Sequence, residues 1–121
     1  MEVLTFWASG FPFAADLREV EEVLREPNFS LPKVILAEEL GFGGFSGEAL
    51  VVGGESPFLV VVDEVDGVTS LSPAQIYPLP TLIEAKLRFP WIWALAYREE
   101  RVLWLVDLPA LVPKGGDADV P

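Results

Sequence analysis

The sequence predicts an all-β fold that is mainly antiparallel and arranged as small barrels. Three pairs of short apolar runs are each joined by a few turn-forming or charged residues, which is the pattern of a β-hairpin. Helical signals are confined to short segments, and long helices do not alternate with the strands. Short strands with little helix between them are typical of antiparallel barrels rather than of α/β layers.

The amino-terminal third of the chain predicts the first hairpin. Strands are expected at 3–8 and 11–14, joined by the two-residue turn candidate Ser9-Gly10. Further along, the segment VILAEELGF at 34–42 predicts a short strand that turns into one helical turn, which Gly41 caps.

A strongly acidic helix is predicted between these two segments. Asp16 and Glu19 are spaced as the cap and the third residue of a helix. Apolar residues then recur at helical intervals, namely Leu17, Val20 and Leu24. Pro27 ends the run.

The second hairpin occupies the middle of the chain. The apolar runs 49–52 and 58–62 are joined by the turn formers at 53–56. Because the second run is continuously apolar and too short for a stable helix, it predicts a strand that is covered on both faces.

The third hairpin joins the apolar runs 92–97 and 102–106 through a charged tetrad at 98–101. Strand periodicity places the larger side chains on one face, where they are expected to pack: Trp91, Trp93, Leu95 and Tyr97. The opposite face carries Ile92, Ala94 and Ala96, of which the small alanines allow close approach.

Two single helical turns are predicted near these strands. The segment Ser72-Pro73-Ala74-Gln75 has the pattern of a capping box, and Pro78 and Pro80 are expected to stop the turn that it begins. A second turn is expected at 110–111, after the last strand ends.

The order of these motifs resembles the CheW-like domain family, the coupling proteins of bacterial chemosensory arrays. Sequences of that family show a strand ending in an Asp-Glu-Val-like turn, a Pro-rich connector, and a closing hairpin ending in Leu-Asp-Leu. The matching residues here are Val62-Asp63-Glu64-Val65, Ile76-Tyr77-Pro78 and Val106-Asp107-Leu108, preceded by the similar segments Glu22-Val23-Leu24, Leu31-Pro32 and VILAEELGF. The resemblance covers most of 3–112.

The resemblance implies two SH3-like five-stranded barrels that share a core within a single domain, 1–112. The first barrel is expected at about 1–50 and the second at 51–112. Family members place a further strand after the Leu-Pro pair, whereas Lys33 here leads directly into the next apolar run. The first barrel is therefore expected to be abbreviated. Residues 113–121 have little apolar content and predict a disordered tail.

The family has no chemistry of its own, so the resemblance implies a non-enzymatic adaptor with no cofactor. It also implies the partners, which are the regulatory domain of a CheA-type histidine kinase and the cytoplasmic tip of a chemoreceptor. Edge and loop packing would tether the kinase and shift its active population.

Composition limits the other possibilities. A chain of 121 residues that is 51% apolar predicts one domain. The net charge of −11 disfavours nucleic acid and anionic membrane surfaces as partners. No apolar run approaches the roughly 20 residues of a membrane span, and the acidic start is unlike a secretory signal, so a cytoplasmic protein is expected. The single Asn, Gln and Met with eleven Pro are a thermophile signal.

The sequence offers few side chains for catalysis, because it has no His to act as a general base and no Cys to act as a nucleophile. The acidic residues Asp63, Glu64 and Asp66 cluster beside a glycine, where a turn is favoured over a carboxylate enzyme or a metal site. The glycine-rich stretch 41–47 lacks the Lys-Ser or Lys-Thr of a phosphate loop. No catalytic residue and no metal ligand is predicted.

Aromatic residues supply the candidate partner-binding site. Phe42 and Phe45 stand among glycines, where they serve as exposed docking anchors or tuck into the core. Trp91, Trp93 and Trp104 form a partner surface if the abbreviated first barrel leaves some of them uncovered, and are otherwise core residues. Tyr97 is a further candidate partner-binding residue. The alternative function is a small β-barrel sensor that binds an apolar or cationic small molecule through its tryptophans.

Overall fold

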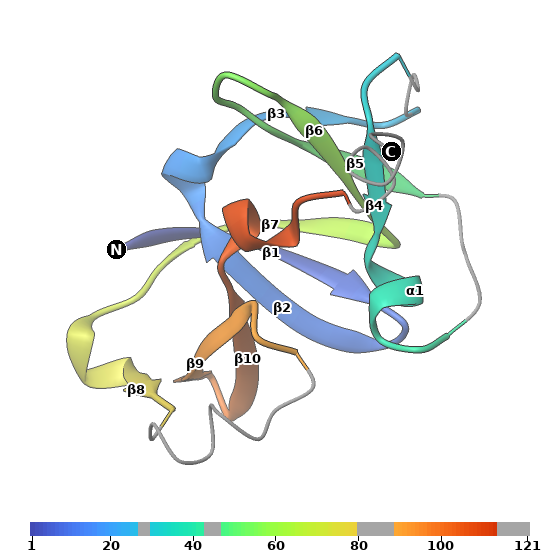
Figure 1. Cartoon of the computed structure of the whole chain (residues 1–121). Coiled ribbons are helices and arrows are strands. Elements are labelled where there is room, and N and C mark those ends of the chain that lie inside the picture. The colour runs from blue at the N-terminus through green and yellow to red at the C-terminus, as the bar shows by residue number, and fades with distance from the viewer. Residues whose placement is uncertain (27–29, 43–46, 80–88, 114–121) are drawn as a thin grey trace.

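The computed structural model describes residues 1–26, 30–42, 47–79 and 89–113, which form two β-sheets (Figure 1). The larger sheet has six strands in the order β7 (Glu64–Ser70), β1 (Glu2–Ala8), β2 (Phe11–Asp16), β10 (Arg101–Val106), β9 (Ile92–Arg98) and β8 (Ile76–Pro78). The smaller sheet has four strands in the order β3 (Val20–Leu24), β5 (Glu48–Val52), β6 (Phe58–Val62) and β4 (Lys33–Ile35).

Helical structure is limited to short turns between the strands. They are the 3₁₀ turns η1 (Leu17–Glu19), η2 (Pro73–Gln75) and η3 (Leu108–Leu111), and one α-helical turn, α1 (Leu36–Glu39). Among the described strands, β10 pairs parallel with β2 and β4 pairs parallel with β6, and the other pairings are antiparallel. The predicted fold class, all-β and mainly antiparallel with short helical turns, is confirmed.

The chain crosses from one sheet to the other and back. The middle of the chain, β3 to β6, builds the four-stranded sheet, and the segments on either side of it build the six-stranded sheet. The four described strands of the smaller sheet are one fewer than a complete five-stranded barrel would have. The division of the chain into two barrels near residue 50 stays a prediction.

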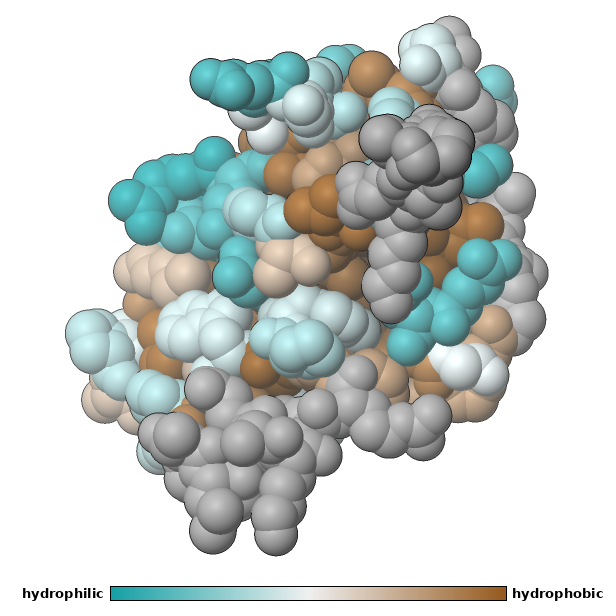
Figure 2. All heavy atoms as spheres, in the orientation of Figure 1, coloured by the Kyte–Doolittle hydropathy of each residue, from teal (hydrophilic) through white to brown (hydrophobic). Residues whose placement is uncertain are grey.

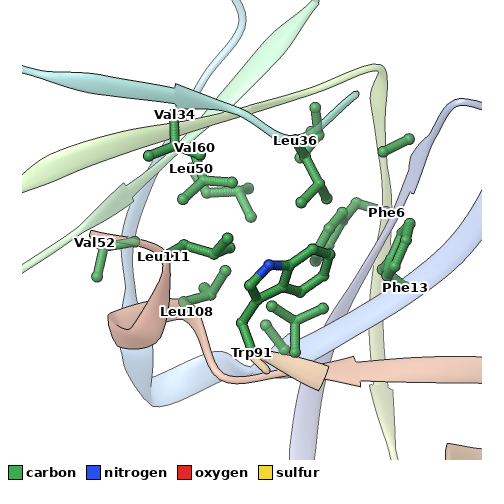
Figure 3. Close-up of a cluster of buried hydrophobic side chains, with 14 of the residues drawn as sticks. Phe6, Phe13, Val34, Leu36, Leu50, Val52, Val60, Trp91, Leu108 and Leu111 are labelled. Carbon is green, nitrogen blue, oxygen red and sulfur yellow. The ribbon is translucent and has the colours of Figure 1, made fainter. Parts of the chain in front are cut away.

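A shared core lies between the two sheets, and a smaller cluster lies on the outer side of each sheet. In the shared core, side chains of the six-stranded sheet face those of the four-stranded sheet across the indole of Trp91 (Figure 3). The labelled side chains there are Phe6, Phe13, Val34, Leu36, Leu50, Val52, Val60, Trp91, Leu108 and Leu111. Burial on both sides explains why β6, between β5 and β4, is buried at every residue, as its continuous apolar run predicts.

The three predicted hairpins are present, and two of them close with turns of positive φ. Ser9 and Gly10 have φ of 52° and 82°, and Glu99 and Glu100 have φ of 52° and 61°. Ala8 pairs with Phe11, and Arg98 pairs with Arg101, so each turn has two central residues. Two-residue turns of positive φ match the right-handed twist of paired strands.

The Glu99-Glu100 turn is expected to gain stability from the sequence Asn-Gly. Non-glycine residues with positive φ are strained, and Asn-Gly is the preferred pair for this turn. We expect Glu99→Asn with Glu100→Gly to raise the free energy of unfolding by about 1 kcal/mol in urea denaturation. Gly10→Ala is the opposite control: it adds strain at φ 82° without any clash and should lower stability. Equal effects of both changes would contradict this account of the turns.

The prediction of an acidic helix after the first hairpin is wrong. Only η1 is helical there, where the Asp16 carboxylate accepts a hydrogen bond from the Arg18 backbone N–H at 2.9 Å. The residues that follow form β3, which pairs antiparallel with β5. Three apolar residues at helical spacing are a weak signal, and the strand pairing of β-branched Val20 and Val23 outweighs it.

The prediction of which side chains share a face of the last hairpin is wrong at its start, because a β-bulge interrupts β9. The register between β9 and β10 shifts so that Ala94 pairs with Leu105 but Ile92 pairs with Val106, which leaves Trp93 as the extra residue. Trp91 and Ile92 therefore both join the shared core, and Trp93 packs against the outer cluster. The buried face of β9 beyond the bulge is the alanine face, so the larger residues there do not pack as expected.

The helical turns follow the predicted sequence signals closely. At α1, the Phe42 N–H donates to the Ala37 carbonyl at 2.8 Å and the Gly41 N–H donates to the Glu38 carbonyl at 3.0 Å, with φ of 93° at Gly41. This is a Schellman cap.

The capping box forms at η2, where the Ser72 N–H donates to the Gln75 side chain at 2.8 Å. The predicted end of that turn is wrong, because Ile76 to Pro78 pair with β9 as edge strand β8. An edge strand tolerates Pro78, since no other described strand pairs with its second side. The turn predicted at 110–111 lies within η3.

Candidate functional site

An open apolar groove lies where the cap of α1 meets the six-stranded sheet. Its side chains are Phe11, Phe13, Leu40, Phe42, Phe89, Ile92 and Trp104, and its volume is about 330 Å³. Phe13 and Ile92 are buried and form the floor. The Schellman cap directs the chain so that Phe42 stands at the rim, 52% exposed. The Phe42 and Phe11 rings approach to 6.3 Å between centroids.

Strand register extends the groove into a wider surface on the same face of the sheet. Directly paired residues share a face, and Phe13 pairs with Trp104, which pairs with Leu95, which in turn pairs with Tyr77. Beside this row, Tyr97 pairs with Val102. We call the following set the apolar face: Phe11, Phe42, Tyr77, Leu95, Tyr97, Val102 and Trp104.

The apolar face gathers much of the exposed apolar surface that the structure describes. Phe42, Tyr77 and Tyr97 are each at least half exposed, and Phe11 and Val102 are exposed as well. In contrast, hydrophilic side chains cover the region of η1 and the tip of the β5–β6 hairpin (Figure 2). A contiguous set of large exposed apolar side chains is typical of an interaction surface.

The five aromatic residues predicted as a site do not all come together. Phe42 and Tyr97 lie on the apolar face and are exposed. Trp93 is half-buried against the cluster on the outer side of the sheet, and Trp91 is buried in the shared core. Phe45 lies outside the described residues.

The sequence missed four members of the apolar face: Phe11, Tyr77, Leu95 and Val102. Only the order of the strands in the sheet brings them together, because β2, β8 and β10 are far apart in the chain. The four tryptophans also lie apart, since Trp7 is on the opposite face of the sheet from Trp104 and the other two belong to different clusters. This arrangement gives no common tryptophan cage.

Two of the three carboxylates singled out in the sequence, Asp63 and Asp66, make structural hydrogen bonds, as does the nearby Glu48. Asp63 accepts from the Ser9 N–H at 2.9 Å, and Asp66 lies 3.4 Å from the Thr5 hydroxyl. Glu48 accepts from the Val65 N–H at 2.7 Å. Within the described segments, no three or more acidic, His or Cys side chains are arranged to hold a metal ion.

A second acidic group surrounds the start of η1. Burial, followed by repulsion from Asp107 and Asp16, raises the pKa of Glu19 above its ordinary value. One Glu19 carboxylate oxygen is buried without a hydrogen-bond partner. The pKa of Asp16 is lowered, chiefly by the hydrogen bond from the Arg18 side chain. Ionised Asp16 therefore stabilises the fold, whereas ionised Glu19 destabilises it.

Glu19→Gln is expected to stabilise the fold at neutral pH. Because the folded state holds the Glu19 proton more tightly than the unfolded state, ionised Glu19 costs stability, and this cost disappears as the pH falls through its raised pKa. We expect a gain of roughly 0.5 kcal/mol at neutral pH that shrinks in acid, measured by thermal unfolding across pH. Asp16→Asn should instead destabilise at neutral pH, since the stability that ionised Asp16 provides is lost only as pH falls through its lowered pKa. A gain for Glu19→Gln that grows as pH falls would contradict the assignment.

No helix in the described part of the chain is long and apolar enough to cross a membrane. No protein-family model matches the sequence, and the search of curated proteins finds no match. Among solved structures, the chain is similar to the scaffolding protein TtCheW from Thermoanaerobacter tengcongensis, with a TM-score of 0.73 and 14% sequence identity. The match covers 88% of this chain and 84% of that one. The chain therefore has a CheW-like fold.

Proposed function

We propose that this protein is a non-enzymatic adaptor of a bacterial chemosensory system, which couples a histidine kinase to a receptor by docking. The apolar face is the observation that carries the proposal. Its exposed aromatic side chains surround a groove with a buried floor, an arrangement that suits the insertion of a partner's large apolar side chains. The fold shared with a scaffolding protein supports the same class of function.

The proposed partners are the regulatory domain of a CheA-type histidine kinase and the cytoplasmic tip of a chemoreceptor. A partner helix or loop would place apolar residues between Phe42 and Trp104, and would cover Tyr97 at the end of the β9–β10 hairpin. Burial of exposed aromatic rings would provide most of the binding free energy, since interface energy concentrates in a few such residues. The proposal needs no catalytic group and no cofactor, and the protein would act in the cytoplasm.

The proposal is tested by capturing partners from a lysate of the source organism with the tagged chain. Recovery of a histidine kinase or a receptor, identified by mass spectrometry, is the expected result. Failure to recover either one with abundant folded chain would count against the adaptor function. The same experiment with the variants described next separates docking at the apolar face from nonspecific capture.

Phe42→Ala is expected to weaken partner binding at least tenfold while leaving the fold nearly unchanged. The ring is half exposed and contacts Phe11 at the rim, so its removal takes little from the core. Val68→Ala is the matched control, because Val68 is 56% exposed on β7, an edge strand away from the groove. Equal partner affinity of the two variants in calorimetry would rule out the groove as the docking site. A large fall in the Tm of Phe42→Ala would instead show that the ring is a core residue.

A further inference from the structure

A second pocket lies on the other face of the six-stranded sheet from the apolar face. Side chains of alternate residues in β1 and β10 point there, because Phe6 and Trp104 pack in the shared core while Thr5, Trp7, Arg101 and Leu103 line this pocket. The outer cluster closes one end of this side of the sheet. The pocket is about 250 Å³, smaller than the roughly 300–1,000 Å³ of pockets that hold drug-sized ligands, so its occupant is small.

Two arginines from the β9–β10 hairpin line the pocket together. Arg98 and Arg101 are directly paired across the strands, where like charges are unfavourable. The Arg101 guanidinium lies 5.4 Å from the centre of the Trp7 ring, and Arg98 donates to the Ser70 carbonyl at 3.3 Å. Both cations are thus held in place before any ligand arrives.

The other described arginines lie outside this pocket, and each of them has a carboxylate partner of its own. Arg18 pairs with Asp16 at 2.7 Å, and Arg25 lies 3.6 Å from Glu48. In a chain with a net charge of −11, Arg98 and Arg101 bring two positive charges into one pocket, beside the two carboxylates that also line it. Screening over about 8 Å at physiological ionic strength limits the repulsion that distant carboxylates exert on an anion there.

Two carboxylates also line the pocket, and neither one neutralises both arginines. Asp66 lies 3.4 Å from the Thr5 hydroxyl. Glu99 lies 3.6 Å from Arg98, but its side chain is 73% exposed, and such exposed ion pairs contribute little. A ligand anion can therefore replace Glu99 as the partner of Arg98 while it also reaches Arg101.

We propose that this pocket binds a small organic carboxylate with an apolar or aromatic body. The carboxylate would accept hydrogen bonds from Arg98 and Arg101, and guanidinium groups match carboxylate oxygens in geometry as well as charge. The body would pack on Trp7 and on the buried Leu103 side chain. The site is separate from the apolar face, so it operates whether or not the chain is an adaptor.

The test is an NMR titration of the full chain with phenylacetate, compared with phenylacetamide, which has the same shape and no charge. We expect phenylacetate to shift the Trp7 indole resonance and to bind at least tenfold more tightly than the amide. Arg98→Gln and Arg101→Gln should each weaken phenylacetate binding about tenfold. Arg25→Gln removes the same charge from another exposed site and should change the affinity less than twofold.

Three results would overturn the proposal: no phenylacetate binding at millimolar concentration, equal binding of the amide, or an equal loss in Arg25→Gln and Arg101→Gln. Because Arg101 is exposed, Arg101→Gln should stay folded, which an unchanged Tm would verify. Phe42→Ala should leave phenylacetate binding unchanged, so failure at this pocket is distinguishable from failure of the docking proposal.

Discussion

Gly47→Ala is expected to destabilise the protein by about 3 kcal/mol, the upper end of overpacking effects. A Cβ at Gly47 would lie 2.5 Å from the Asp63 carbonyl oxygen and would also collide with the carbonyl oxygen of Val62. Both atoms belong to the backbone, and Glu48 next to Gly47 is already paired with Val62 in the sheet. The added methyl can therefore be accommodated only by moving β5 away from β6.

Urea denaturation measures this effect, with Gly67→Ala as the matched control. Gly67 lies in a β-strand, the edge strand β7. Nothing lies within 4 Å of the Cβ that the substitution would add, and the φ of Gly67 is not positive. The control should change the free energy of unfolding by less than about 0.5 kcal/mol. Similar losses for both variants would show that glycine entropy, and not the close approach of Gly47, decides stability there.

Trp91→Ala is expected to cost about 3–5 kcal/mol, in the range measured for large aromatic residues removed from cores. Trp91 is 4% exposed, lies at the centre of the shared core in Figure 3, and contacts the Phe13 and Phe89 rings with centroids 6.4 Å and 5.5 Å apart. Its carbonyl also accepts a hydrogen bond from the Asp107 N–H at 2.7 Å, which the substitution leaves in place. The loss would therefore report packing between the two sheets.

Tyr97→Ala is the control for that prediction, because Tyr97 stands on the same strand hairpin but is 50% exposed. Its removal should cost less than about 1 kcal/mol in thermal or urea unfolding. If Trp91→Ala were as mild as Tyr97→Ala, Trp91 would not belong to the core, and the packing of the two sheets around it would be wrong.

The fold class and the local turns could be predicted because each depends on residues that are close in the sequence. The two-residue turn at Ser9-Gly10, the cap at Gly41 and the capping box at 72–75 all rest on local backbone chemistry. The burial of β6 could also be predicted, because a continuous apolar run is typical of a strand that is covered on both faces.

The errors occurred where distant parts of the chain decide the structure. Pairing with β5 turns Val20 to Leu24 into a strand, although the spacing of apolar residues favours a helix. The bulge at Trp93 is set by the pairing of β9 with β10, and one extra residue exchanges the faces of the strand. Strict alternation therefore misplaced Ile92, which belongs to the shared core, and Trp93, which packs against the outer cluster.

The candidate site was only partly accessible to sequence reasoning for the same reason. The exposure of Phe42 follows from the local cap after α1. Its neighbours on the apolar face come from strands that meet through the parallel pairing of β2 with β10 and the antiparallel pairing of β8 with β9. Neither pairing has a signal in a single sequence, so Phe11 and Tyr77 could not be placed beside the predicted residues.

The most direct test of the adaptor account is a calorimetric titration of the chain with the purified regulatory domain of a CheA-type kinase from the same organism. The account predicts binding with a negative heat-capacity change, the signature of buried apolar surface, and at least a tenfold loss in Phe42→Ala but not in Val68→Ala. The absence of binding to the regulatory domain and to the receptor tip by the folded chain would contradict the account.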